Sequence, residues 1–188
     1  MSELDALATL AAVIRRRRTS MLVDKEQAVP RRLVEQLCDL AQSAPNHKRT
    51  WPWRFALAEG EGRARLGEVI AAAMEAHGDE PEKVARARTK YLRTPTVLVV
   101  GSAAGDSELR TAENRDAVAA GVQNILLAAT AAGLASYWGS CPKGANEVVA
   151  GLCGFEQGTT VVAIIYLGWA TETVMAPERP GVTLHIID

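Results

Sequence analysis

Four consecutive arginines, Arg15 to Arg18, are followed directly by the hydroxyl groups of Thr19 and Ser20. Guanidinium groups bind phosphate oxygens through paired hydrogen bonds, and hydroxyl groups add further donors. The segment is therefore a candidate phosphate site. The competing interpretation is a solvated helix end whose positive charge complements the helix dipole. Because basic runs are common at helix ends, the segment taken alone favours this second interpretation.

A second candidate is a polar loop that lies between Pro45 and Pro52 and leads into the aromatic segment starting at Trp53. Its Asn46, His47 and the lysine that follows offer hydrogen-bonding groups for a planar heteroaromatic ring. Loops carry binding sites when a rigid scaffold holds them. A plain turn anchored to the core by an aromatic side chain fits the same residues, and spacing alone leaves both interpretations open.

The third candidate is the segment 133–140, which reads GLASYWGS. Its small residues would let a flat ligand approach the backbone closely. Trp138 either forms the wall of a pocket or belongs to the core.

Several other chemistries have little support in the sequence. It contains neither the glycine-rich dinucleotide-binding motif nor a P-loop. The three histidines and three cysteines show no metal-ligand spacing. The sequence also lacks the G-x-S-x-G motif of serine hydrolases.

The length of 188 residues, with 48% hydrophobic and 23% charged positions, is typical of one globular domain spanning residues 1–188. A net charge of −1 gives no basic excess for nucleic acid. The odd number of cysteines, without a C-x-x-C motif, favours reduced thiols. The first residues are acidic before they are apolar, unlike a secretory signal, so we expect a cytoplasmic protein.

Hydrophobic periodicity predicts an α+β fold with about six helices and four or five strands. Ser2 and Asp5 have the spacing of a capping box for the first helix. The tail after Pro177 alternates like a strand, which needs a sheet to join, either its own or a partner's. The expected helices cover residues 4–14, 30–44, 66–78, 112–135 and 143–152, the expected strands residues 53–57, 96–100 and 160–167, and an exposed, weakly helical excursion residues 82–93.

The helix at 112–135 is apolar enough to raise a membrane span as an alternative. Gln123 and Asn124 lie in its middle, and no tryptophan or basic residue belts its ends. We therefore expect a buried central helix whose small residues permit close packing.

In order along the chain, the three candidate segments and their flanks resemble the nitroreductase-like family of flavin mononucleotide (FMN) enzymes, in particular its small, minimal-length branch. The resemblance runs from about Ile14 to Gly168. The residues that carry it are Arg17-Arg18-Thr19, Val29-Pro30, Ala44-Pro45, Pro52-Trp53-Arg54-Phe55, Gln123-Asn124, Gly133-Leu134 and Leu167-Gly168.

The resemblance implies a mixed central sheet of four to five strands surrounded by helices, and a homodimer with interfacial helices, an extended C-terminal tail and two sites at the subunit interface. Each site would hold FMN noncovalently. It would pass hydride from NADH or NADPH through the flavin N5 to nitroaromatic, quinone or similar electron-poor acceptors in a ping-pong cycle. No catalytic residue is implied, because the flavin itself carries the redox chemistry.

The resemblance also assigns roles to individual residues. Arg17 and Thr19 would hold the phosphate and ribityl end, and Arg18 would line the same segment. Asn46 and His47 would approach the flavin from the other subunit. The implied cofactor-binding residues are Arg17, Arg18, Thr19, Ser43, Asn46, His47, Trp138, Gly139 and Ser140.

One departure from the family pattern is Met21, where members commonly carry a lysine or arginine near the flavin N1 and O2. Arg18, Lys48 and Lys143 are candidates for a replacement cation. The departure gives weight to an alternative in which the flavin supports dehydrogenation or fragmentation instead of reduction. A non-enzymatic flavin-binding or storage dimer is a further alternative, because a fold does not fix a function.

Overall fold

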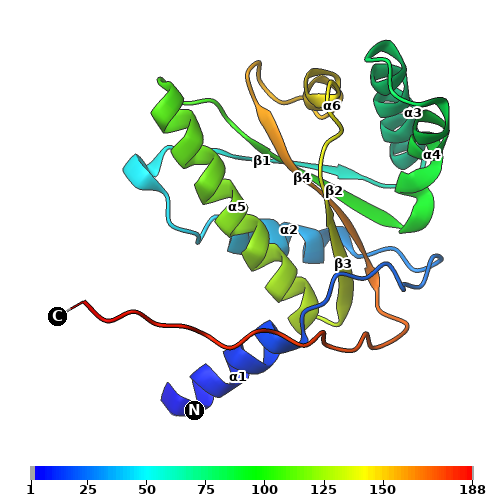
Figure 1. The fold of residues 1–188 in the computed structure, drawn as a ribbon. Coiled ribbons are helices and arrows are strands. Elements are labelled where there is room, and N and C mark those ends of the chain that lie inside the picture. Colours follow the sequence, from blue (N-terminus) through cyan, green and yellow to red (C-terminus); the bar gives the residue numbers. More distant parts are fainter. Residues whose placement is uncertain (1–2, 188) are drawn as a thin grey trace.

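A four-stranded sheet runs through the centre of the computed structural model, which describes residues 3–187 (Figure 1). The strand order is β1-β2-β4-β3, and all three neighbouring pairs are antiparallel. A parallel element enters only through a bridge between Thr19 and Ser136, as far as the described residues show. The strands are β1 (Trp53–Ala58), β2 (Thr96–Ser102), β3 (Leu134–Gly139) and β4 (Thr160–Trp169).

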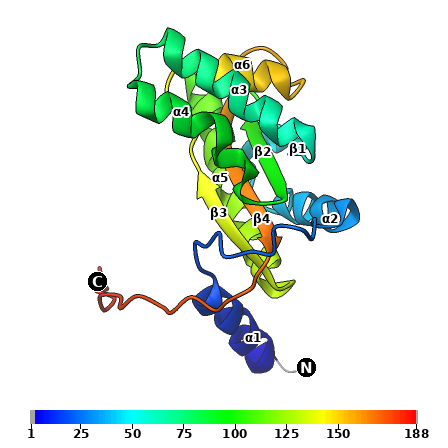
Figure 2. The same cartoon turned by 90° about the vertical axis from the view of Figure 1, so that its right-hand side faces the viewer.

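Helices cover both faces of this sheet (Figure 2). One core cluster joins the sheet to α2 (Arg31–Ala41) and α5 (Glu108–Ala131). The other joins it to α3 (Glu61–Ala76), α4 (Pro81–Lys90) and α6 (Asn146–Leu152). The prediction of an α+β fold with four or five strands is confirmed.

Burial on both faces explains the sequence of the central strands. Every residue of β2 is buried, with Leu98 and Val100 facing α5 and with Val97 and Val99 facing α3. Such a strand is a continuous apolar run instead of an alternating one. This matches the expectation for residues 96–100. The strand expected at 160–167 continues through Gly168 to Trp169.

Helix α5 is the buried central helix that the sequence predicts. Its buried side includes Ala117, Val118, Val122, Ile125 and Ala129. Within residues 3–187, no helix is both long enough and apolar enough to cross a bilayer.

Several predicted bounds differ from the structure: the helix predicted at 112–135 spans 108–131, and the helix predicted at 143–152 begins at 146. Helix α2 ends at Ala41 instead of residue 44, because a turn follows in which Ala44 N–H still bonds the Ala41 carbonyl. The excursion at 82–93 is helix α4 followed by a 3-10 turn (Tyr91–Arg93), and Tyr91 is 1% exposed because it packs into the second core cluster. Residues 134–139, in which we predicted no strand, form β3.

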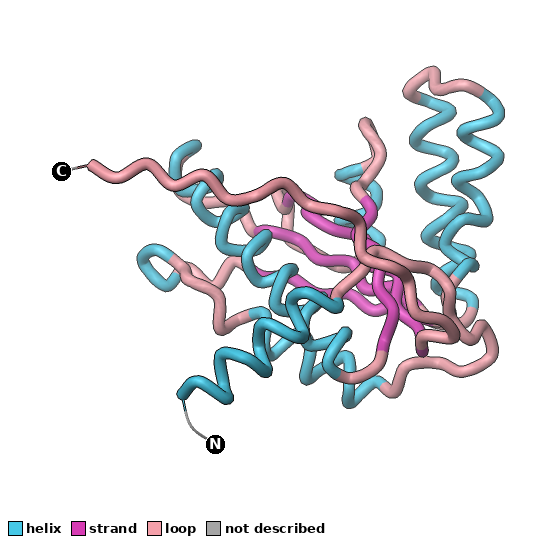
Figure 3. Tube along the Cα trace, turned by 60° about the horizontal axis from the view of Figure 1, so that its bottom comes forward, coloured by secondary structure: helices cyan, strands magenta, loops and turns pink. Residues whose placement is uncertain are grey.

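The predicted strand in the tail does not form in the protein's own sheet. Residues 171–187 contain no strand and run past α1 (Glu3–Arg16) and away from the sheet (Figure 3). The alternating residues Val182, Leu184 and Ile186 are 80–96% exposed. The predicted capping box at the start of α1 involves Ser2, which lies outside the described residues.

Helix α1 projects from the sheet and has no buried residue (Figures 1 and 2). Its leucine and isoleucine side chains recur every three or four positions and form one stripe, and all of them are exposed. The exposed residues of the stripe are Leu4, Leu7, Leu10 and Ile14.

We expect Gly121→Ala to lower the free energy of unfolding by about 1–3 kcal/mol, as overpacking of a tight core does. An added Cβ at Gly121 would lie 2.5 Å from the Trp53 Nε1 and 2.7 Å from the Ala41 carbonyl oxygen, so α2 and α5 would have to separate. Urea denaturation measures the change. Gly151→Ala is the matched control, since its Cβ meets no atom within 4 Å. Equal stability of the two variants would contradict the packing argument.

Candidate functional site

The residues that follow the arginines, Thr19 and Ser20, and the middle of β3 are far apart in sequence but lie side by side. Thr19 forms a parallel bridge with Ser136, and the Ser20 N–H donates to the Ser136 carbonyl at 3.0 Å. The structure therefore joins the first and third candidate segments into one polar strip along the edge of the sheet.

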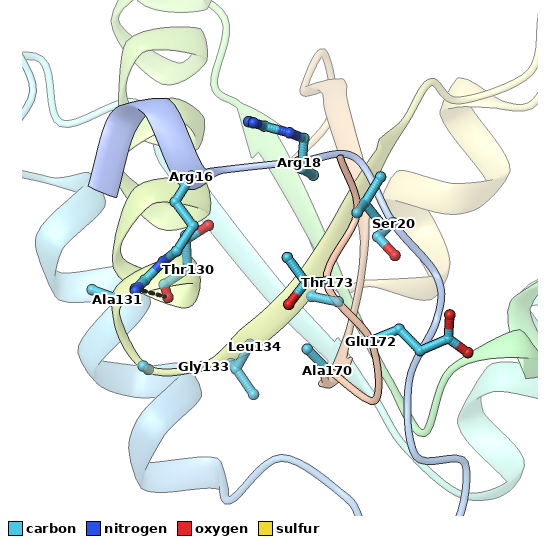
Figure 4. A pocket seen from close by; sticks show the side chains of 13 residues that line it. Arg16, Arg18, Ser20, Thr130, Ala131, Gly133, Leu134, Ala170, Glu172 and Thr173 are labelled. Carbon is cyan, nitrogen blue, oxygen red and sulfur yellow. Dashed lines mark hydrogen bonds between the residues drawn. The ribbon is translucent and has the colours of Figure 1, made fainter. Parts of the chain in front are cut away.

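The arginines of this strip have different partners. Arg16 Nη2 donates to the Thr130 carbonyl at the end of α5 (3.0 Å), and Figure 4 shows this contact. Arg18 Nη1 turns back and donates to the carbonyls of Arg15 (2.6 Å) and Arg17 (2.7 Å). The helix-end interpretation thus describes Arg16 and Arg18. The half-buried Arg17 side chain has no hydrogen-bond or ion-pair partner within residues 3–187, so its guanidinium group is free to bind an anion.

A cavity of about 400 Å³ opens beside this strip, between Arg18, Ser20, Gly133 and the start of the tail at Glu172 (Figure 4). Two buried polar atoms of the strip, Arg18 Nε and Ser136 Oγ, have no hydrogen-bond partner in the described part of the chain. A buried polar atom without a partner costs about 1–3 kcal/mol. The strip therefore has unused hydrogen-bonding capacity that fits a phosphorylated, hydroxyl-rich ligand such as FMN.

The residues at the end of β3, Trp138 and Gly139, and Ser140 directly after it form the rest of the third candidate segment. Trp138 Nε1 donates to the Val162 carbonyl at 3.2 Å, which anchors a ring that is still 38% exposed. At Gly139 an added Cβ would lie 3.3 Å from both the Tyr166 ring and the Ile164 carbonyl oxygen. Ser140 follows the strand and is exposed. Trp138 is thus anchored to the sheet by its indole nitrogen and partly exposed, so it shows features of both predicted roles, a core residue and a pocket wall.

The polar loop is held together by amide side chains. Asn46 Nδ2 donates to Thr50 Oγ1 (3.0 Å), and Asn46 Oδ1 accepts from the Trp51 N–H (2.9 Å). The Thr50 hydroxyl donates to Asn114 Oδ1 (2.6 Å), and Asn114 Nδ2 donates to the Ala103 carbonyl (3.1 Å). Asn114 is 2% exposed. Asn46 therefore shapes the loop, and one Nδ2 hydrogen is left for a ligand.

Backbone strain accompanies this network. Lys48, Arg49 and Trp51 have φ values of 62°, 53° and 50°, in the left-handed region that side chains rarely adopt. Such residues cost about 1–3 kcal/mol each and cluster at ligand-binding and catalytic sites. The strain supports the interpretation of this loop as a functional element.

The exposed His47 ring is fixed by two residues of α5. His47 Nδ1 lies 2.9 Å from Glu113 Oε1, and Arg110 Nη1 donates to Glu113 Oε2 at 2.5 Å. Arg110 Nη1 also lies 3.0 Å from His47 Nδ1. One ring nitrogen cannot donate to the carboxylate and accept from Arg110 at once. We assign the Nδ1 hydrogen to the bond with Glu113, because the negative carboxylate is the stronger acceptor.

This bond from His47, with further help from Arg110, lowers the pKa of the Glu113 carboxyl below its usual value. Neither Glu113 nor Arg110 was among the residues predicted from the sequence. The only sequence signal was an oppositely charged pair three residues apart in a helix. That signal does not reveal a partner more than sixty positions away.

The two polar groups lie at opposite ends of α5. The arginine segment is tied to Thr130 through Arg16, and the loop is tied to Glu113 through His47. Seventeen residues of helix at 1.5 Å each separate these two anchors by about 25 Å. Within one protomer, His47 is therefore not brought together with the arginine segment.

Comparison of the sequence and the fold with known proteins shows which proteins this chain resembles. The chain is 29% identical over 166 residues to the provisionally named NAD(P)H nitroreductase YdjA of Escherichia coli K12, covering 88% of both chains. The crystal structure of a nitroreductase-like family protein from Bacillus cereus has a TM-score of 0.77 and 29% identity, with 95% of both chains covered. A Bacteroides fragilis nitroreductase with bound FMN, at 20% identity and a TM-score of 0.73, covers 95% of this chain and 98% of its own and shares the fold.

The model of the Nitroreductase family matches residues 14–169. The protein belongs to the Nitroreductase family, and the family prediction made from the ordered motifs is confirmed.

We expect Asn114→Ala to destabilise the protein by about 1–3 kcal/mol, because Thr50 and the Ala103 carbonyl both lose a buried partner. The loop at 46–51 should also exchange its amide hydrogens faster. Urea denaturation and hydrogen–deuterium exchange measure the two effects. Arg115→Ala, an exposed change on the same helix, is the control. Unchanged exchange in the loop would show that Asn114 does not hold it.

Proposed function

We propose that this protein is an FMN-dependent NAD(P)H oxidoreductase that reduces nitroaromatic, quinone or similar electron-poor acceptors in a ping-pong cycle. Membership of the Nitroreductase family supports the class of reaction, and the name of the Escherichia coli relative supports the electron donor. The observation that carries the proposal is the half-buried Arg17 side chain, which has no partner in the described chain and directly precedes Arg18, whose buried Nε has no partner either.

In this proposal the strip binds the polar end of FMN. Its phosphate carries nearly two negative charges, so burial requires positively charged donors. Arg17 would bind the phosphate, and Thr19 and Ser136 would bind the phosphate and ribityl oxygens. The backbone of Trp138, Gly139 and Ser140 would lie along the flavin ring. When bound, the flavin accepts a hydride from NADH or NADPH and passes it to the acceptor.

A second copy of the chain would complete each site. His47 lies about 25 Å along α5 from the arginine segment, so one flavin can meet both groups only if another protomer supplies the loop. A two-fold axis makes the exchange mutual, and Ser43, Asn46 and His47 of each copy then reach the flavin held by the other.

The surface of the protomer supports such an association. The apolar stripe of α1 is exposed along its whole length, and an isolated helix of 14 residues is only marginally stable in water. The exposed alternating tail would be covered by the same partner. Both features agree with a homodimer, for which we propose a cytoplasmic location.

Because position 21 is a methionine, the segment after α1 does not supply the lysine or arginine that family members commonly place near the flavin N1 and O2. The Nη1 of Arg18 is engaged by two backbone carbonyls, which makes Arg18 the weakest of the three candidates for a replacement. Lys48 follows His47 in the loop and has no ion-pair partner within residues 3–187. We propose that Lys48 of the second copy supplies the missing positive charge.

The first test is the visible absorbance spectrum of purified protein supplemented with FMN, before and after anaerobic addition of NADH or NADPH. We expect a bound-flavin spectrum that bleaches with at least one donor and recovers on addition of a nitroaromatic or a quinone. A bound flavin that neither donor bleaches would favour the alternative flavin chemistries or a storage role. Absence of FMN binding would overturn the proposal.

The shared site predicts complementation between inactive variants. Arg17→Gln should weaken FMN binding about 10- to 100-fold, the effect of losing a charged hydrogen bond of about 1.5–3 kcal/mol. After Arg17→Gln and His47→Gln homodimers are mixed and allowed to exchange subunits, each heterodimer has one intact site. Activity should then rise to about one quarter of the wild-type value, because half of the dimers are mixed.

Flavin fluorescence measures the affinity, and turnover measures the complementation. Arg15→Gln, an exposed arginine of α1, is the control for charge alone. If subunits exchange but the mixture is no more active than the two variants alone, Arg17 and His47 do not belong to the same interfacial site.

A further inference from the structure

We propose that His47 donates the proton that the acceptor needs when it is reduced, and that Glu113 is the positioning residue that aims His47 at the acceptor. This inference rests on the proposed function, because it places His47 beside a flavin held by the other protomer. It adds a proton donor to a site for which the sequence implied no catalytic residue.

The first argument is the geometry of the ring. His47 Nδ1 is bound to Glu113 Oε1 at 2.9 Å, and the carboxylate is held on its other oxygen by Arg110 at 2.5 Å. Among residues 3–187, no hydrogen bond reaches His47 Nε2. The ring is thus fixed on one side, and its second nitrogen faces solvent on a side chain that is 57% exposed.

The second argument is the rigidity of the support. Lys48, Arg49 and Trp51 of this loop have φ values in the left-handed region. Such strained residues cluster at functional sites, and a loop that contacts only solvent has no need of them. Here Asn46, Thr50 and the buried Asn114 lock the loop onto α5 through bonds of 2.6–3.0 Å. A histidine at the tip of such a loop has a defined position, as a proton donor requires.

The third argument is the charge balance of the reaction. A quinone that receives a hydride becomes an anion, and an anion removed from water is unstable without a proton. In the proposed step, the His47 Nε2–H bond breaks, its proton bonds the free oxygen of the acceptor, and a hydroquinone leaves. The neutral ring then regains a proton from solvent, to which it is exposed.

Two charged groups contact His47, and two more adjoin it in the sequence. Glu113 and Arg110 come from α5, and Lys48 and Arg49 follow it in the 3-10 turn (His47–Arg49). Glu113 is the only carboxylate of the four and the group bonded to the ring. Loss of this carboxylate would remove the hydrogen bond that fixes the ring and would leave Arg110 as the remaining neighbour of Nδ1.

The experiment separates the two halves of the catalytic cycle by stopped-flow absorbance, with every variant saturated in FMN. NADPH, or NADH if it is the better donor, reduces the enzyme in the first half, and 1,4-benzoquinone reoxidises it in the second. We expect His47→Gln to slow reoxidation about 100-fold or more, and Glu113→Gln to slow it about tenfold, relative to any change in the first half.

Two readouts distinguish a proton donor from a merely structural residue. Wild-type reoxidation should slow as pH rises and should be slower in D2O, and both effects should be lost in His47→Gln. Added imidazole should restore part of the rate in that variant. Glu108→Gln, an exposed carboxylate of the same helix, is the control and should match the wild type.

The possible failures point to different conclusions. If wild-type flavin is bound but is not bleached by NADH or NADPH, the proposed function fails. If bleaching is normal and the reoxidation of both variants keeps the wild-type rate, pH profile and isotope effect, the inference about His47 and Glu113 is wrong. If His47→Gln cannot be loaded with FMN, Glu113→Gln decides, because it keeps the imidazole and changes only its support.

Discussion

The length of one buried helix, α5, sets the distance between the two polar groups of the candidate site. Helix α5 is held along its length between the sheet and α2, and it carries a polar attachment at each end. The Thr130 carbonyl ties the arginine segment to one end, and Glu113 ties the histidine loop to the other. Since a helix neither shortens nor bends easily within a packed core, one chain keeps the two groups apart. Our proposal of a second copy rests on this rigid separation more directly than on any exposed surface.

Much of the fold follows from local patterns in the sequence. Continuous apolar runs predicted β2 and β4, because strands covered on both faces need no polar positions. The small residues of α5 predicted close packing, which Gly121 illustrates against Trp53. The pattern failed where tertiary contacts decide the structure. Residues 134–139 mix small and aromatic residues, and they form a strand because β4 and the segment around Thr19 flank them.

The candidate site was predictable only in part, for a similar reason. Basic and hydroxyl residues indicated a phosphate site, but their sequence could not distinguish Arg17, which has no partner in the described chain, from Arg18, which bonds backbone carbonyls. That difference depends on how the chain turns after α1. Glu113 and Arg110 were missed because their importance comes from one long-range contact with His47. Asn46 was predicted to approach the cofactor, and the structure shows that most of its hydrogen bonds hold the loop instead.

Because the apolar stripe of α1 is exposed, the stability of this helix can depend on protein concentration. No residue of this helix is buried in the protomer, so the free energy that keeps it helical must come mainly from whatever covers Leu7 and its neighbours. When that cover is another molecule of the same kind, stability obeys mass action and falls on dilution. Helix α1 ends at Arg16, directly before Arg17, so the position of Arg17 depends on how α1 is held. If Arg17 binds the cofactor as we propose, cofactor retention would then depend on enzyme concentration.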